Sequence, residues 1–243
     1  MIKIETLLNK KEVFSFSSEV VCIGFFDGVH KMHKKILEKT KNIAKENNFK
    51  WSIITFTEKV SDFLNSTKNN IQLKEKKYNI FEKEFNPNGL IEIQVNNETI
   101  KKQPEEFCDF LKNNLKVKKI VVGSDFKFGF KGEGNVLLLQ KYFGKENIII
   151  FDRVENISTS LIREKISTGS VQEIKKILEH DLIVSAKRTD VSRYLIEDFK
   201  IKLPNSFYLI RLKDQILEVE ITDNSFKIDS NSDVIELELL EKK

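Results

Sequence analysis

Two histidines lie three residues apart in the stretch GFFDGVHKMHKK, residues 24–35. The stretch follows the apolar run EVVCI and leads into a lysine-rich helical pattern, so His30 and His33 stand where a strand passes into a helix. Both imidazoles then fall on one side of the first helical turn, beside backbone N–H groups that lack a helical partner. Imidazoles and a helix N-terminus together suit an anion, above all a phosphate.

The same pair of histidines has two other interpretations. A histidine near a helix start is often a surface or capping residue, and an H-x-x-H pattern also fits a metal site. A metal is less favoured, because no further Cys, His or Glu completes a ligand set nearby and His180 follows a separate helical pattern. The local pattern leaves both phosphate binding and a surface role open.

The composition favours a globular protein over a disordered one. The chain has 243 residues, 40% of them apolar, which is enough for one sizeable domain and a smaller one. Its 41 Lys and Arg and 37 Asp and Glu are interleaved, which indicates a solvated surface and argues against nucleic-acid binding. Cys22 and Cys108 are too few for a disulfide framework and have no metal-ligand spacing.

The sequence also predicts a location in the cell. The N-terminus MIKIETLLNKKEVF has no basic-then-apolar signal pattern. No later run approaches the roughly 20 apolar residues that span a bilayer. We therefore expect a cytoplasmic protein that does not bind membranes.

Apolar runs with helical patterns between them predict a parallel α/β sheet. The runs are VVCIGFF, WSIITF, LIEIQV, KIVVG and NIIIF, and they are rich in Val and Ile without polar alternation. Such runs are typical of strands that are covered on both faces. After His30 the apolar residues recur at helical spacing, and a further helix is expected from Pro104, where a fixed φ suits a first turn.

Beyond about residue 180 the pattern changes. SFYLIRL, QILEVEI and DVIELELL are short, mostly alternating runs separated by turn-forming residues, which predicts antiparallel strands. We therefore expect an α/β domain over residues 1–180 and a small, mostly antiparallel β domain over residues 181–243.

The stretch IGFFDGVHKMHKKIL resembles the first signature of the bacterial riboflavin kinase/FAD synthetase family, in the H-x-G-H nucleotidyltransferase superfamily. The usual family form is close to G-x-F-D-G-V-H-x-G-H-x-x-L-L. Two later stretches, VVGSDFKFGFKGEGNVLLL at 121–139 and ISTSLIREKISTGSVQEIKKIL at 157–178, are similar to family segments in the same order. The resemblance covers about residues 15–180.

The resemblance implies a Rossmann-like domain that performs adenylyl transfer: FMN attacks the α-phosphate of ATP, giving FAD and pyrophosphate. Mg²⁺ is expected with ATP and no dedicated protein metal site is expected. The implied catalytic residues are His30, His33, Asp125 and Arg163. The implied ATP-binding residues are Gly24, Phe25, Phe26, Asp27, Gly28, His30, His33, Ser158, Thr159, Ser160 and Arg163. The implied FMN-binding residues are Asp125, Phe126, Phe128 and Asn135.

Several of these residues have a second interpretation. Asp27 could contact nucleotide or only orient its loop. The hydroxyl groups of residues 158–160 could bind phosphate or only cap a helix. Phe126 and Phe128 alternate in a way that favours core packing over stacking on the flavin ring.

Three departures from the family pattern bear on activity. Met32 replaces the glycine between the two histidines, TFTEKV stands where the family has T-F-x-P-H-P, and Phe25 occupies a position where Asn is common. These changes leave two alternatives to FAD synthesis open. One is a catalytically decayed homologue that binds flavin or nucleotide, and the other is a nucleotidyltransferase for another phosphorylated acceptor.

The C-terminal region departs further. Its IKLPNSFYLIRL segment resembles a strand of the family's riboflavin kinase barrel, but the kinase's G-x-P-T-A-N motif is absent. We expect a reduced, riboflavin-kinase-like barrel without kinase activity. The expected partners are ATP, FMN and FAD, and the sequence predicts no oligomeric state.

Overall fold

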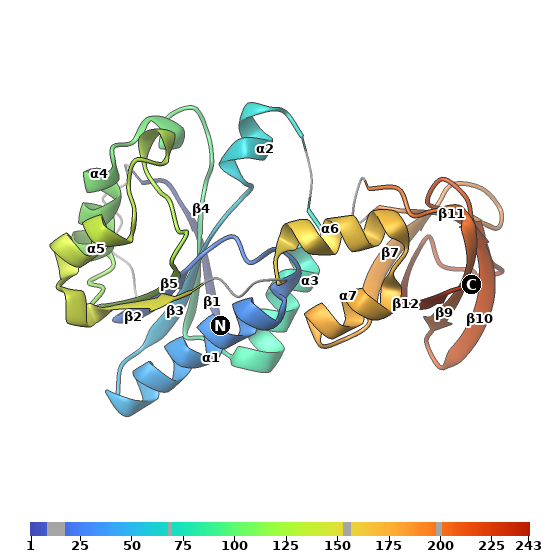
Figure 1. Cartoon of the computed structure of the whole chain (residues 1–243), viewed down its shortest axis with the longest axis horizontal. Helices are drawn as coiled ribbons and strands as arrows, with labels where there is room; N and C mark the ends of the chain where they lie inside the picture. The colour runs from blue at the N-terminus through green and yellow to red at the C-terminus, as the bar shows by residue number, and fades with distance from the viewer. Residues whose placement is uncertain (9–17, 68–69, 153–156, 198–200) are drawn as a thin grey trace. The chain divides into compact units, whose positions relative to one another are not determined.

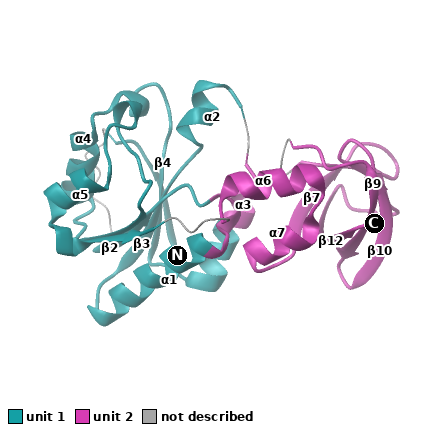
Figure 2. Ribbon diagram, viewed as in Figure 1, with its two compact units in different colours: residues 1–26, 32–67, 78–154 teal, residues 27–31, 68–77, 155–243 magenta. Residues whose placement is uncertain are grey.

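The computed structural model describes residues 1–8, 18–67, 70–152, 157–197 and 201–243. The chain divides into two compact units, which Figure 2 colours separately. The first comprises residues 1–26, 32–67 and 78–154, and the second comprises residues 27–31, 68–77 and 155–243. Each unit is described by itself.

The first unit is built on a parallel sheet in the order β1-β4-β3-β2-β5-β6 (Figure 1). Its strands are β1 (Ile2–Thr6), β2 (Val20–Ile23), β3 (Trp51–Phe56), β4 (Gly89–Ile93), β5 (Lys119–Gly123) and β6 (Ile148–Phe151). All five predicted apolar runs form strands. The edge strand β1 was not predicted, because Ile2 and Lys3 are exposed and the strand lacks a buried apolar run.

Helices cover this sheet on both faces. The helices of this unit are α1 (Lys31–Glu46), α2 (Val60–Leu64), α4 (Pro104–Asp109) and α5 (Val136–Phe143). The helix α3 (Lys74–Ile80) begins in the second unit and ends in the first. Single turns complete the helical elements of the first unit: η2 (Phe81–Phe85), η3 (Thr99–Lys101), η4 (Phe110–Asn114), η5 (Phe130–Gly132) and η6 (Lys145–Asn147). The single turn η1 (Asp27–Val29) belongs to the second unit.

The strand β2 shows why its sequence has no polar alternation. Val21 and Ile23 join the apolar cluster that α4, η4 and α5 build on one face. Cys22, which lies between them, is also fully buried, and its side chain points to the opposite face of the sheet because side chains alternate along a strand. All four residues of β2 are therefore buried, and the predicted Rossmann-like α/β fold is confirmed.

The second unit contains an antiparallel sheet in the order β10-β9-β12-β7-β8-β11. Its elements are the helices α6 (Thr159–Thr168) and α7 (Val171–Leu178) and the strands β7 (Leu182–Arg188), β8 (Arg193–Ile196), β9 (Ser206–Leu212), β10 (Gln215–Ile221), β11 (Ser225–Lys227) and β12 (Val234–Lys242). The inner face of the sheet and the two helices share one apolar core, in which Tyr194 and Tyr208 are fully buried. The predicted antiparallel β region is confirmed.

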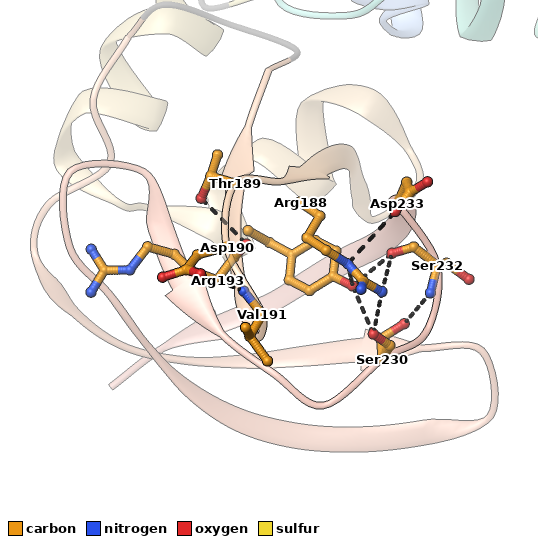
Figure 3. A network of polar contacts seen from close by, with 9 residues as sticks. Arg188, Thr189, Asp190, Val191, Arg193, Ser230, Ser232 and Asp233 are labelled. Carbon is orange, nitrogen blue, oxygen red and sulfur yellow. Dashed lines mark hydrogen bonds and ion pairs between the residues drawn. The ribbon is translucent and has the colours of Figure 1, made fainter.

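One end of this sheet is closed by a polar network (Figure 3). Arg188, at the end of β7, donates Nη2–H to the backbone oxygens of Ser230 and Ser232 at 2.5 and 3.1 Å. The Tyr194 hydroxyl donates to the Ser232 oxygen at 2.6 Å. These bonds tie the loop before β12 to the hairpin of β7 and β8, and they satisfy a tyrosine that is otherwise wholly buried.

The second compact unit contains α6 and α7 together with the antiparallel sheet. The sequence instead predicts a domain boundary at residue 180, after both helices. That boundary stays a prediction. Among the described residues, no helix combines the length and the apolar character needed to cross a membrane.

Candidate active site

The sheet of the first unit reverses its strand order at β2 and β5. From β2 the chain proceeds outward through β3 and β4 on one side and through β5 and β6 on the other. Cys22 pairs with Val121, so the segments after β2 and β5 leave the same edge of the sheet side by side. Ligands of open α/β sheets bind outside the carboxyl ends of the strands at such a reversal. The stretches GFF at 24–26 and GSDF at 123–126 both begin there.

The segment after β3 joins this edge. Gly24 N–H donates to the Ile54 oxygen at 3.1 Å, and Thr55 Oγ1 donates to the Phe25 oxygen at 3.4 Å. The Lys59 ammonium lies 4.9 Å from the centre of the Phe25 ring, where a cation is attracted to the π face. The TFTEKV segment, in which the sequence departs from the expected pattern, therefore lies beside Phe25.

Phe26 packs against one of the two predicted histidines. The ring of His33, the third residue of α1, meets the ring of Phe26 edge to face at 5.3 Å between centroids and 88°. A Cβ atom on Gly24 would lie only 3.0 Å from Phe26 Cζ, so glycine at this position makes room for the ring. Phe81 also packs against Phe26 edge to face, at 6.0 Å between ring centroids and 88°.

The backbone from Phe26 to Val29, just before α1, is strained. Phe26 has φ 54° and the fully buried Val29 has φ 39°, although a β-branched residue disfavours positive φ. Gly28, at φ 74°, is the member of the loop that adopts this region without strain. Strained residues cost on the order of 1–3 kcal/mol each and persist only where the surrounding structure holds them, which is common at functional sites.

Asp27 lies in this loop and its carboxylate is buried within the second unit, with only 3% of the side chain exposed. Oδ1 accepts a hydrogen bond from the Ile71 backbone N–H at 2.9 Å. Oδ2 accepts one from Arg163 Nη2 at 3.2 Å, and this pair is also a salt bridge. Residues from the first and the third motif, 136 positions apart in sequence, thus meet directly.

His30 directly precedes α1 and is 4% exposed. Its burial lowers its pKa from 6.5 to about 4, although the nearby carboxylate of Asp27 and a backbone hydrogen bond act in the opposite direction. His30 is therefore a neutral imidazole near pH 7 and can offer one N–H to an acceptor.

The predicted helix N-terminus in the third motif is confirmed. Ser158 is the N-cap of α6, and its side-chain oxygen accepts from Leu161 N–H at 3.1 Å. Thr159 opens the helix and is half-buried, and Ser160 is exposed in its first turn. Ser158 thus has the capping role, and the phosphate role of the three hydroxyl groups stays a prediction.

The four residues predicted for FMN lie in the loop that leads from β5 to α5. Asp125 is exposed in the turn after β5. Phe128 is 6% exposed and packs in the core against Phe107 at 5.1 Å, and Phe126 stacks on Phe128 at 5.5 Å. Asn135 caps α5, accepting from Leu137 and Leu138 N–H at 3.0 and 3.2 Å. Asp125 is therefore the member most open to a ligand.

A protein-built metal site is not evident in the described part of the chain, where no group of three or more His, Cys, Asp or Glu side chains could hold a metal ion.

Sequence reasoning missed three residues that build this region: Thr55, Ile71 and Phe81. Thr55 donates to the Phe25 oxygen, the Ile71 N–H donates to Asp27, and the Phe81 ring packs against Phe26. Ile71 and Phe81 are apolar and fit the pattern of ordinary core residues, so no signal in the sequence marks them.

The FAD synthetase family model matches residues 14–168 of the chain. A protein of Listeria monocytogenes serovar 1/2a that is named FAD synthetase is 33% identical over 172 residues, which are 66% of this chain and 68% of that protein. The bifunctional riboflavin kinase/FMN adenylyltransferase of Buchnera aphidicola subsp. Schizaphis graminum is 31% identical over 173 residues, 70% of this chain and 54% of the relative. The chain thus spans about half the length of the bifunctional relatives it matches.

A solved structure covers the whole chain. The crystal structure titled macrolide-efflux protein from Streptococcus pneumoniae superposes with a TM-score of 0.83 at 20% identity, over 100% of this chain and 91% of that one. At this identity the likeness concerns the fold alone.

Proposed function

The chain belongs to the FAD synthetase family, and from this membership we propose that it transfers AMP from ATP to FMN, releasing FAD and pyrophosphate. The observation that carries the proposal is the contact of Asp27 with Arg163, which joins the first and third family motifs at one buried carboxylate. A pair of motif residues that served only separate loops would not need to meet in this way.

Adenylyl transfer forms a bond between an FMN phosphate oxygen and the α-phosphorus of ATP and breaks the bond to the pyrophosphate oxygen. Catalysis of such a displacement depends mostly on positioning and charge stabilisation. We assign His30 and His33 to the α-phosphate region, His30 as a neutral N–H donor. We assign Arg163 to the β- and γ-phosphates, because a planar fork of N–H donors suits phosphate oxygens.

The remaining assignments follow the same motifs. Gly24, Phe25, Phe26 and Gly28 shape the loop that approaches ATP. Ser158, Thr159 and Ser160 place an N-terminal helix turn near phosphate. Asp125 faces FMN, with Phe126, Phe128 and Asn135 as the wall behind it. Mg²⁺ enters as part of the MgATP substrate.

An assay with two substrates tests the proposal. Purified protein receives MgATP with either FMN or riboflavin, and the products are separated by chromatography. We expect FAD from FMN, with one pyrophosphate released for each FAD. No FAD above the enzyme-free level, together with adenylylation of another phosphorylated acceptor, would contradict the proposal.

The same assay addresses the second unit. We propose that it lacks riboflavin kinase activity, because residues 181–243 contain no G-x-P-T-A-N segment. Riboflavin with MgATP should then yield no FMN. A substantial rate of FMN formation would overturn this part of the proposal, whatever the result with FMN.

A second candidate is a protein that binds flavin or nucleotide without turnover. It is favoured by the departures from the family pattern, which place Met32 in the first turn of α1 and Lys59 beside Phe25. Calorimetric binding of FMN or ATP by a protein with no turnover would support this candidate. We propose the cytoplasm as the place of action, with ATP, FMN and FAD as the partners.

A further inference from the structure

The donors to the carboxylate of Asp27 include two of different kinds. One is the backbone N–H of Ile71, at 2.9 Å from Oδ1, and the other is the guanidinium of Arg163, at 3.2 Å from Oδ2. A backbone donor cannot rotate away as a side chain can. The hydrogen bond at Oδ1 therefore holds the carboxylate in place, so that Oδ2 accepts from Arg163 at a fixed position.

The donor at Ile71 is itself immobilised by packing. Ile71 is 1% exposed and belongs to the same apolar cluster as Ile162 and Ile166 of α6. Its side chain also approaches Gly28, where a Cβ would lie 3.5 Å from two of its atoms. The loop at 27–29 and the helix α6 therefore both pack against the core residue whose N–H holds the carboxylate.

The two ends of the ion pair differ in exposure. The Asp27 side chain is 3% exposed and that of Arg163 is 26% exposed. A nucleotide phosphate can approach the exposed end, whereas the buried carboxylate is enclosed by its own contacts. A buried carboxylate is stable only when it is paired and hydrogen-bonded, and this one has both kinds of partner.

We propose that Asp27 is a positioning residue for Arg163: it orients the guanidinium toward the nucleotide phosphates and does not itself contact the nucleotide. This inference rests on the proposed function, since it assigns Arg163 to phosphate. The sequence leaves open whether Asp27 contacts the nucleotide, and the proposal is that it acts only through Arg163.

The test is a double-mutant cycle on MgATP binding, measured by calorimetry without FMN. Asp27→Asn keeps an oxygen for the Ile71 N–H but places an amide where Oδ2 accepted from Arg163. We expect MgATP to bind about tenfold more weakly in this variant, within the range of coupling energies for residues in contact. In an Arg163→Met background the same substitution should change the dissociation constant by less than about twofold.

Two results would overturn the proposal. An equal, roughly tenfold loss in both backgrounds would mean that Asp27 contacts the nucleotide itself. An unchanged or tighter dissociation constant for Asp27→Asn in the parent background would mean that the pair does not orient Arg163 for binding. Because binding is measured without turnover, these outcomes are distinct from a failure to make FAD.

A matched control lies on the same helix. Lys165 Nζ of α6 pairs with Glu173 at 2.9 Å, so Glu173→Gln also removes the carboxylate partner of an α6 cation. MgATP binding should stay within about twofold of the parent in this control.

A measurement on the parent protein covers the case in which Asp27→Asn does not fold. The side-chain NMR signals of Arg163, assigned with an Arg163→Lys variant, should show slow rotation of the guanidinium before nucleotide is added. A freely rotating Arg163 guanidinium in the nucleotide-free protein would contradict the proposal.

Discussion

Two arginines of the second unit, Arg163 and Arg188, use their guanidinium groups in different ways. Arg188 donates to the backbone oxygens of Ser230 and Ser232, and its Nε–H donates to the Tyr194 hydroxyl at 3.2 Å (Figure 3). The carboxylate that Arg188 meets, that of Asp233 at 3.8 Å, is 92% exposed, whereas Arg163 pairs with the buried carboxylate of Asp27. The side chains are almost equally exposed, at 26% for Arg163 and 27% for Arg188.

Exposure alone would therefore not distinguish the two residues, but their partners do. Arg188 donates hydrogen bonds to backbone oxygens of the loop before β12, and these bonds contribute to stability. A carboxylate anchored by a backbone N–H directs the Arg163 fork, which is a contribution to binding geometry. The comparison predicts that alanine lowers activity at Arg163 and lowers stability at Arg188.

Arg163→Ala should have the largest effect in the molecule. We expect FAD formation to fall about 100- to 1000-fold, since removing one donor from developing transition-state charge typically costs this much. Arg188→Ala, measured beside it by steady-state kinetics at 25 °C, should retain the parent kcat/KM. Similar losses of activity in both variants would abolish the distinction between the two arginines.

Acid should destabilise the region around Asp27 through His30. The folded pKa of His30 is about 4 and its ordinary value is 6.5, so between these pH values the unfolded chain binds the proton first. Stability is unaffected above about pH 6.5 and is lost as pH falls toward 4, by on the order of 2–3 kcal/mol at about pH 4.5.

Urea unfolding of the parent and a His30→Gln variant at about pH 7 and pH 4.5 measures this contribution. The parent should lose about 2–3 kcal/mol more than the variant between the two pH values. Equal losses in both proteins would show that His30 titrates normally in the folded state.

Arg188→Ala should lower the free energy of unfolding by about 2 kcal/mol, because two backbone oxygens and a buried tyrosine hydroxyl lose a charged donor. Thermal and urea unfolding measure this value. An Arg193→Ala substitution in the next strand, where the side chain is exposed, is the matched control and should stay within about 0.5 kcal/mol. A loss below about 0.5 kcal/mol in Arg188→Ala would contradict its structural role.

Met32→Gly should have the smallest effect. Met32 lies in the first turn of α1, where glycine costs up to about 1 kcal/mol of helix stability. Removing its side chain beside the proposed phosphate region should raise kcat/KM for FAD formation by less than about tenfold. A decrease in kcat/KM with unchanged stability would show that Met32 takes part in catalysis.

The sequence predicted the parallel sheet, the antiparallel strands and the helix N-terminus at Ser158 because each depends on local pattern. The apolar run of β2 and the alternation in β10 are visible within a few residues. β1 escaped prediction because it is an edge strand whose first residues are exposed.

The contacts that build the candidate site were less predictable. The motifs identify Asp27 and Arg163, but their meeting and the anchoring by Ile71 N–H depend on residues 44 and 136 positions away in the chain. The strain at Val29 is equally hidden, since nothing in its own residue type indicates a positive φ. Local patterns show which residues are candidates, and only packing shows which of them touch.

The most direct measurement of the central claim follows the α-phosphate of ATP. Purified protein is given FMN and MgATP labelled at the α-phosphorus, and the flavin products are separated. The proposed reaction predicts that the label appears in FAD and that unlabelled pyrophosphate is released in equal amount. Label that stays in ATP, or that appears only in a product without flavin, would contradict FAD synthesis by this chain.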